Sequence, residues 1–201
     1  MTDMTQLLLV RHGQSTWNAA GRCQGQSSAA GGLSPEGEAQ ARATAEELAK
    51  KLVSDREILA DTIVASDLSR ALQTAQIIAD VLGLPIRLDA GLREQCLGEL
   101  EGKLYIEQFG ASTVQGTIDE LWRDPFRRPP GGEGVADMYD RVQTTLTRLA
   151  EEYPGRILVV ATHGGVVRTA TAAQPQPGTP IPHTTVDNAS ITPWSASCPV
   201  Q

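Results

Sequence analysis

The tripeptide Arg11-His12-Gly13 carries the clearest chemical signal of the chain, because it directly follows the apolar residues 7–10. A short apolar run that ends at a glycine is typical of a buried strand. In an open α/β sheet, ligands bind where the strands end. An arginine beside a histidine at such an end combines a fixed anion receptor with a nitrogen that can act as a nucleophile or base.

Further polar residues stand where other strand-like segments end. They are Arg70 after residues 62–65, Glu94 after residues 86–88, and His163-Gly164 after residues 156–161. Because the carboxyl ends of parallel strands share one rim of a sheet, we expect these side chains to meet Arg11 and His12 in one crevice.

The side chains predicted to gather there suit the transfer of a phosphoryl group. Two arginines and two histidines make a strongly positive pocket, which favours a phosphate or carboxylate ligand. A histidine nitrogen can attack phosphorus and form a covalent phosphohistidine, while arginines hold the equatorial oxygens in the transition state. A glutamate beside them can give a proton to the leaving oxygen.

Strand and helix patterns alternate along the chain and predict how this crevice is built. Ser34 and Pro35 mark the start of a helix. A second helix is expected to be capped by Ser66-Asp67 and to end at Gly83. A third helix, with Met138, Val142, Leu146 and Leu149 on one face, follows the turn-rich residues 125–134.

Two regions give weaker patterns. Residues 104–123 are predicted to hold helix with breaks near Gly110 and Gly116, and residues 190–192 are predicted to form a last short strand. The whole alternation predicts an α/β fold with three layers: a doubly wound, mostly parallel sheet with helices on both faces. A length of 201 residues fits a single domain over residues 1–201.

Composition excludes several classes of partner. The 17 basic and 24 acidic residues give a net charge of -7 without a basic stripe, so we expect neither nucleic acid nor a membrane surface as partner. The longest apolar stretches are too short for a membrane span or a secretory signal. Cys23, Cys96 and Cys198 are scattered and form no CxxC pair, which predicts free thiols and a cytoplasmic location.

Several ordered stretches resemble the histidine phosphatase family, in the branch that contains cofactor-dependent phosphoglycerate mutases and related phosphatases. They are LLLVRHGQSTWN, GRCQGQ, LSPEGEAQA, VASDLSRALQTAQ, LREQCLGELEGK, PPGGEG and VVATHGGVVR, between residues 7 and 168, with a weaker match over residues 187–192. The resemblance implies a phosphoglycerate mutase-like fold.

The resemblance also implies a role for each matching residue. The expected catalytic residues are His12 as the phosphorylated nucleophile, Glu94 as the proton donor and acceptor, and Arg11, Arg70 and His163 as phosphate ligands. Asn18, Gln24, Gly25 and the backbone of Gly164 are expected to contact phosphate or substrate. The family needs no metal, and the chain has no HExxH, paired-cysteine or Asp-x-Asp pattern. We expect no cofactor.

Three departures from the family pattern concern the walls of the site. Many related phosphatases carry an aspartate where this chain has residues 27–32, so either a substrate contact is missing or this loop is mobile. The span from Glu94 to His163 is shorter than in the mutases, which opens the site to water and favours hydrolysis. Residues 174–178 are rich in proline where relatives continue as helix, which leaves the local sheet edge and any oligomer contact open.

We therefore expect a metal-independent phosphomonoester phosphatase that hydrolyses a small phosphorylated metabolite through a phosphohistidine. A cofactor-dependent phosphoglycerate mutase is the first alternative. The second is a non-catalytic module of the same fold that binds a phosphate ligand, although the presence of the catalytic residues argues against it. A homodimer is left open.

Overall fold

A five-stranded sheet with the strand order β3-β2-β6-β1-β7 forms the centre of the protein. The computed structural model describes residues 4–52, 59–182 and 184–195, so His183 and Cys198 lie outside the described residues. The strands are β1 (Gln6–Arg11), β2 (Leu59–Ala65), β3 (Ile86–Leu88), β6 (Ile157–Thr162) and β7 (Ile191–Ser195). The first four are parallel, and β7 pairs antiparallel with β1 at the edge. The predicted mostly parallel sheet is confirmed.

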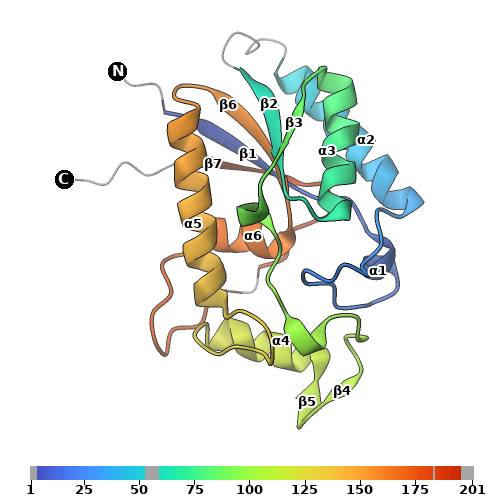
Figure 1. Ribbon diagram of the computed structural model, residues 1–201, viewed down its shortest axis with the longest axis vertical. Coiled ribbons are helices and arrows are strands. Elements are labelled where there is room, and N and C mark those ends of the chain that lie inside the picture. Colours follow the sequence, from blue (N-terminus) through green and yellow to red (C-terminus); the bar gives the residue numbers. More distant parts are fainter. Residues whose placement is uncertain (1–3, 53–58, 183, 196–201) are drawn as a thin grey trace, which may run out of the picture.

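Helices cover both faces of this sheet (Figure 1). On one face lie α2 (Pro35–Lys51) and α3 (Ser69–Leu82), and on the other lie α5 (Val135–Glu152) and α6 (Gly164–Ala170). The two faces follow from the alternation of side chains along a strand. In β1, Leu8 and Val10 pack toward α2 and α3, whereas Leu7 and Leu9 belong to the core beneath α5. The three layers agree with the prediction.

The helix ends show where local sequence decides the structure. The hydroxyl of Ser34 accepts a hydrogen bond from the N–H of Gly37 at 3.1 Å and caps α2, as predicted. Gly83, with φ of 70°, ends α3, also as predicted. The prediction that Ser66-Asp67 cap α3 was wrong, because Leu68 is the N-cap and no side chain caps it.

The region between η1 (Ala90–Leu92) and α5 differs in part from its prediction. After the short turn η2 (Gly98–Leu100), it holds a hairpin of β4 (Gln108–Phe109) and β5 (Ser112–Thr113), and then α4 (Val114–Arg123). The break at Gly110 is confirmed, since this residue has φ of 60° in the hairpin turn. The predicted break at Gly116 was wrong, because its N–H donates to the Thr113 hydroxyl that caps α4.

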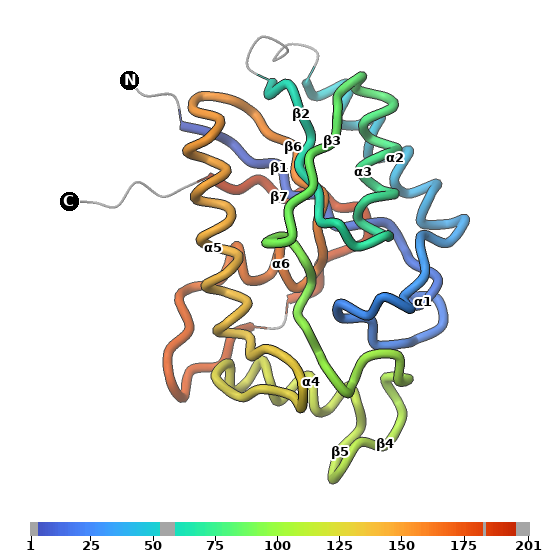
Figure 2. Tube along the Cα trace, viewed as in Figure 1, coloured from blue at the N-terminus to red at the C-terminus, as the bar shows by residue number. Residues whose placement is uncertain are grey.

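The described residues between α6 and β7 have no regular structure, and the chain runs past α4 (Figure 2). Its Ile181 is buried in the core, and the N–H of Ile181 donates to the carbonyl of Trp122 at 2.9 Å. This contact ties the proline-rich segment that follows the short helix α6 to the end of α4.

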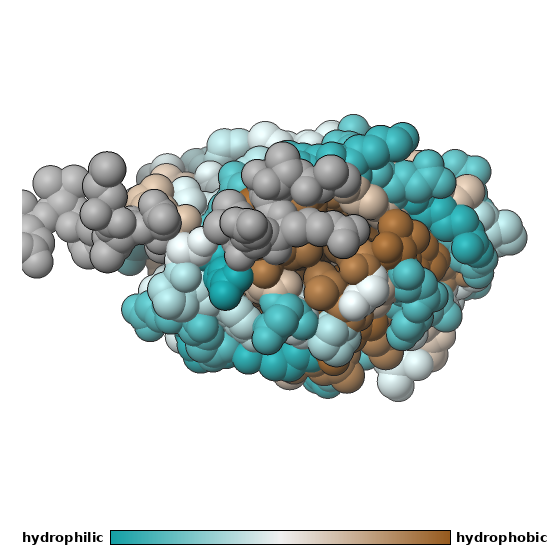
Figure 3. All heavy atoms as spheres, turned by 90° about the horizontal axis from the view of Figure 1, so that it is seen from above, coloured by the Kyte–Doolittle hydropathy of each residue, from teal (hydrophilic) through white to brown (hydrophobic). Residues whose placement is uncertain are grey.

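The opposite end of the sheet exposes an apolar patch, seen from above in Figure 3. A groove there is lined by Leu52, Leu59, Val81, Leu82 and Leu84, from α2, β2, α3 and the turn after α3. Within the described ranges, no helix has the length and apolar composition needed to cross a membrane.

Candidate active site

A cavity of about 350 Å³ lies at the carboxyl ends of β1 and β6. Of the predicted site residues, the following line it: Arg11, His12, Asn18, Gln24, Gly25, Arg70, Glu94 and Gly164. His163 is fully buried and does not line the cavity, but its ring makes an edge contact with that of His12, with 5.2 Å between the ring centroids. The structure therefore brings together residues as far apart in sequence as Arg11 and Gly164, as expected for parallel strands that end on one rim.

His12 is held with one ring nitrogen directed at a cation and the other at the backbone. Its Nε2 lies 3.1 Å from Nε of Arg70, which can only donate, so Nε2 accepts with its lone pair. Its Nδ1 lies 2.7 Å from the carbonyl oxygen of Gly13 and therefore carries the proton. Burial, reinforced by Arg70 and Arg11, lowers the pKa of His12 well below 6.5. The ring is thus neutral near pH 7, in the form that can attack phosphorus.

Arg11 and Arg70 both act on the His12 ring with positive charge. Arg70 is 1% exposed, and its second contact is a hydrogen bond from Nη2 to the carbonyl of Gly25 at 2.9 Å. Arg11 donates from Nη1 to the carbonyl of Val186, while its Nε is buried without a hydrogen-bond partner in the described part of the chain. A buried guanidinium nitrogen with no acceptor is well suited to an anionic ligand.

His163 is oriented by Ser66 at the end of β2. Its Nε2 lies 2.8 Å from the Ser66 hydroxyl, and its Nδ1 is buried without a partner among the described residues. Burial, followed by the nearby Arg70, lowers the pKa of His163 well below 6.5. If the Ser66 hydroxyl donates to Nε2, Nδ1 carries the proton and becomes a donor beside His12. Ser66, which the sequence suggested as a helix cap, serves the site instead.

Glu94 is positioned by backbone N–H groups from two parts of the chain. One carboxylate oxygen accepts from Gln95 at 2.9 Å, and the other accepts from Gly165, at the start of α6, at 3.1 Å. A Cβ on Gly165 would lie 2.1 Å from Glu94 Oε1, so only glycine permits this contact. Gly165 was not among the predicted site residues, although its place beside His163-Gly164 is the signal that could have identified it.

A second residue that sequence reasoning missed is Ser15, which is fully buried beside the cavity. Its N–H donates to Oδ1 of Asn18 at 3.1 Å, and its hydroxyl donates to Oε1 of Gln24 at 2.8 Å. Because the amide oxygens are turned toward Ser15, the NH₂ groups of Asn18 and Gln24 are left to donate into the cavity. Ser15 thus orients two amides at once.

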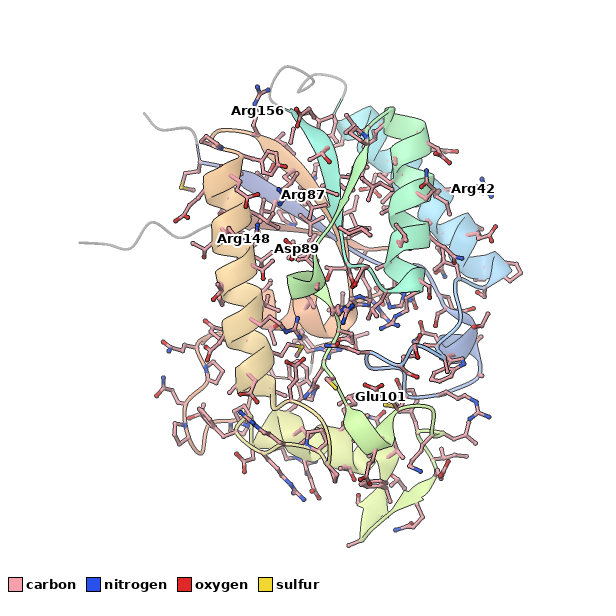
Figure 4. All side chains as sticks on the ribbon, viewed as in Figure 1. Arg42, Arg87, Asp89, Glu101, Arg148 and Arg156 are labelled. Carbon is pink, nitrogen blue, oxygen red and sulfur yellow. The ribbon has the colours of Figure 1, made fainter. Side chains whose placement is uncertain are left out.

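Glu101 fixes the loop that contains Gly25 (Figure 4). Its Oε1 accepts from the N–H groups of Gln26 and Leu97, each at 2.9 Å. Gly25 has φ of 49°, and a Cβ there would lie 2.1 Å from the same carboxylate oxygen. This loop in turn presents the Gly25 carbonyl to Arg70. Residues 27–32 do not line the cavity and contain turn hydrogen bonds, and the two alternatives for this loop stay predictions.

Ion pairs from α5 hold the segment that carries Glu94. Arg141 pairs with Glu133 at 2.5 Å and donates to the carbonyls of Gly91 and Arg93 at 2.9 and 2.8 Å. Farther along α5, Arg148 reaches Asp89 at the start of the same segment (Figure 4). The position of Glu94 is therefore tied to a helix on the face of the sheet.

The outer wall of the cavity includes three side chains that the sequence did not single out, namely Tyr105, Trp122 and Arg168. The guanidinium carbon of Arg168 lies 4.8 Å from the centroid of the Trp122 ring, in a cation–π contact. Burial raises the pKa of Tyr105 to about 12, so its hydroxyl stays protonated. Arg168 follows Gly164 by four residues, and this helical spacing is the signal that could have placed it in the site.

Cysteine chemistry does not fit this cavity. Cys23 and Cys96 are free, as expected, and burial raises the pKa of Cys23 to about 12, which keeps its thiol protonated and unreactive. Across residues 4–52, 59–182 and 184–195, no group of three His, Cys, Asp or Glu side chains is arranged to hold a metal ion.

Comparison with known proteins agrees with this geometry. The family described as "Histidine phosphatase superfamily (branch 1)" matches residues 7–196. The chain is 37% identical over 171 residues to "Phosphoglycerate mutase-like protein 4" of Arabidopsis thaliana, which covers 83% of this chain and 70% of that protein. It is 35% identical over 170 residues to "Metal-independent phosphoserine phosphatase" of Arabidopsis thaliana, which covers 83% and 67% respectively.

A solved structure of a phosphatase is also similar to this protein. Mycobacterial glucosyl-3-phosphoglycerate phosphatase in complex with VO3 is similar with a TM-score of 0.73 and 30% identity, over 94% of this chain and 90% of that chain. From the family match and these relatives, the chain belongs to the histidine phosphatase superfamily, in its branch 1.

Proposed function

We propose that this protein is a metal-independent phosphomonoesterase that acts through a phosphohistidine on His12. The observation that carries the proposal is the state of the His12 ring. Its Nε2 lone pair is directed at Arg70, its Nδ1 is held by Gly13, and burial keeps it neutral. Arg11 Nε and His163 Nδ1, both buried without partners in the described part of the chain, are donors suited to the phosphate oxygens.

In the first step, Nε2 of His12 attacks phosphorus and forms an N–P bond while the bond from phosphorus to the leaving oxygen breaks. Glu94, in its protonated form, gives its proton to that oxygen, so the alcohol leaves neutral. Arg11, Arg70 and His163 stabilise the charge on the equatorial oxygens. The amides of Asn18 and Gln24, with the N–H of Gly25 and Gly164, complete the proposed contacts to phosphate or substrate.

In the second step, water attacks the phosphorus of phosphohistidine and Glu94 takes up a proton from that water. The N–P bond breaks, inorganic phosphate leaves, and His12 returns to its neutral form. One carboxyl group thus serves as acid and then as base, which restores the starting protonation state after each turnover.

The proposed substrate is a small phosphorylated metabolite. The relatives described above include phosphatases named for phosphoserine and for glucosyl-3-phosphoglycerate. A cavity of about 350 Å³ lies at the small end of the range for small-molecule sites. We further propose a single domain over residues 1–201 and a cytoplasmic location, and a homodimer stays a prediction.

Phosphate release by the purified protein tests the proposal. Phosphorylated sugars, acids and nucleotides are supplied with and without a metal chelator. We expect release that the chelator leaves unchanged, competitive inhibition by vanadate, and loss of activity in His12→Ala. A strict requirement for a divalent metal contradicts the mechanism. Fast interconversion of 2- and 3-phosphoglycerate with little phosphate release makes the chain a mutase, and no turnover at all makes it a binding module.

A further inference from the structure

The outer wall of the cavity holds a cation that the proposed chemistry at phosphorus does not use. Arg168 lines the same cavity as His12, from the last turn of α6. Its side chain is fixed on two sides, by the Trp122 ring 4.8 Å from the guanidinium carbon and by a hydrogen bond from Nε to the carbonyl of Thr184 at 2.8 Å. The side chain is partly buried, and burying a charged group lowers the stability of the fold unless an acceptor or an opposite charge compensates it.

No carboxylate of the described residues forms an ion pair with Arg168, whereas Arg141 and Arg148 are paired with Glu133 and Glu152. Glu94 is the carboxylate whose negative charge acts on Arg168, but both Glu94 oxygens already accept from backbone N–H groups. With Nε bonded to Thr184, the Nη edge of Arg168 is left for a ligand. This edge can donate two parallel hydrogen bonds to one carboxylate.

Tyr105 adds a neutral donor to the same wall. Its side chain lines the cavity, and within the described ranges its hydroxyl makes no hydrogen bond to another residue. The phosphate group has its own donors around His12, so neither Arg168 nor Tyr105 is needed for a plain phosphate ester.

We propose that Arg168 and Tyr105 form a subsite for a carboxylate of the substrate, which makes the substrate class phosphomonoesters of hydroxy or amino acids. This inference rests on the proposed function and assigns the part of the substrate beyond the phosphate. One cavity of about 350 Å³ joins the subsite to His12, so a single small molecule reaches both. The planar Nη edge can pair bidentately with a carboxylate or with a second phosphate, and the test therefore includes a bisphosphate.

The test compares substrates that differ only in this group. In 3-phosphoglycerate a carboxylate stands where glycerol 3-phosphate has an uncharged CH₂OH. The specificity ratio, kcat/KM for the first divided by kcat/KM for the second, is measured in the wild type, Arg168→Met and Arg168→Lys. Methionine keeps an apolar side chain of similar length packed on the Trp122 ring but has no charge. Lysine keeps the positive charge but lacks the planar guanidinium that donates two parallel hydrogen bonds. Arg42→Met, exposed on α2 and distant from the cavity, is the matched control (Figure 4).

We expect the wild type to prefer 3-phosphoglycerate, and Arg168→Met to lower the ratio by about 10- to 100-fold, the size of a lost hydrogen-bonded charge contact. Arg168→Lys should give an intermediate ratio, and Arg42→Met the wild-type ratio. Equal losses on both substrates in Arg168→Met, or no loss on either, overturn the subsite. A preference for propane-1,3-diol bisphosphate that depends on Arg168 overturns the choice of carboxylate.

If the wild type releases phosphate from none of the substrates, the proposed function is wrong. The existence of the carboxylate subsite is then tested by measuring ligand binding. Calorimetric Kd values for 3-phosphoglycerate and glycerol 3-phosphate, in the wild type and Arg168→Met, then take the place of kcat/KM. A Kd ratio that Arg168→Met leaves unchanged overturns the subsite independently of catalysis.

Discussion

The substitution Gly165→Ala is expected to leave the fold intact and to impair proton transfer by Glu94. A Cβ at this position would lie 2.1 Å from Oε1 of Glu94 and 3.0 Å from its carboxyl carbon. Ordinary contact needs about 3.4 Å, so the carboxylate oxygen must move by roughly 1.3 Å. Gly165 is the second residue of α6, where alanine fits the helical backbone at least as well as glycine, so Gly165→Ala should fold normally.

A displacement of about 1 Å at a catalytic group costs on the order of 10²-fold in rate. The loss should depend on the leaving group, because only a poor one needs the proton that we assign to Glu94. We therefore expect kcat/KM to fall by about 10²-fold with glycerol 3-phosphate, and by less than about tenfold with p-nitrophenyl phosphate, whose nitrophenolate departs without a proton.

The assay is phosphate release from both substrates by the wild type, Gly165→Ala and Gly164→Ala. At Gly164 the nearest atom to a new Cβ is Nε of Arg11 at 3.3 Å, so a smaller loss with no leaving-group dependence is expected there. Equal losses of Gly165→Ala on both substrates would refute the reasoning, and so would full activity on glycerol 3-phosphate. Circular dichroism and thermal unfolding establish that each variant is folded.

Three other predictions follow from the buried polar groups. Because burial lowers the pKa of His12 well below 6.5, kcat/KM should stay level from pH 7 to 6.5 and fall only at more acid pH; an acid limb centred at or above 6.5 would contradict this. Because the unfolded chain takes up protons that buried His12 and His163 do not, the free energy of unfolding should fall below pH 6.5, by up to about 1.4 kcal/mol per pH unit for each ring. Urea unfolding at several pH values checks this, and His163→Gln should reduce the slope. Arg141→Met should lower the free energy of unfolding by about 1–3 kcal/mol and also lower kcat, since Glu133 loses its partner and the Glu94 segment its anchor; a stability loss with unchanged kcat would remove Arg141 from positioning Glu94.

Elements with strong local signals were predictable from the sequence. The start of α2 at Ser34-Pro35 and the end of α3 at Gly83 depend on neighbouring residues alone. The same holds for the apolar strands β1 and β6, which are buried on both faces. These elements predicted a mostly parallel sheet, and with it the meeting of His12, Arg70 and Glu94 at one rim, but not the order of the strands.

The two failed helix predictions have different causes. Ser66 had the position of a helix cap, but its hydroxyl meets His163, 97 residues away, and such a tertiary contact cannot be deduced from neighbours in sequence. Gly116 had the composition of a break, but the hydroxyl of Thr113, three residues earlier, caps α4 and places Gly116 in its first turn. This second cause is local, and the cap at Thr113 was overlooked in the sequence.

The residues that hold the catalytic groups in place could not be predicted from the sequence. Ser15, Glu101 and Arg141 act through hydrogen bonds to backbone or amide groups whose positions depend on the finished fold. Such residues carry no chemical signature in sequence, unlike the histidine and arginine of residues 11–12. The backbone carbonyls of Thr184 and Val186, which hold Arg168 and Arg11, leave no trace in residue type at all.

The central claim is that turnover passes through a covalent phosphate on Nε2 of His12. Rapid acid-free quenching of the enzyme with ³²P-labelled substrate, followed by peptide mapping, tests it directly. The account predicts an acid-labile, base-stable label on the peptide that contains His12, formed and lost at rates compatible with kcat, and absent in His12→Ala. A label on serine or cysteine, or steady turnover by His12→Ala, would contradict it.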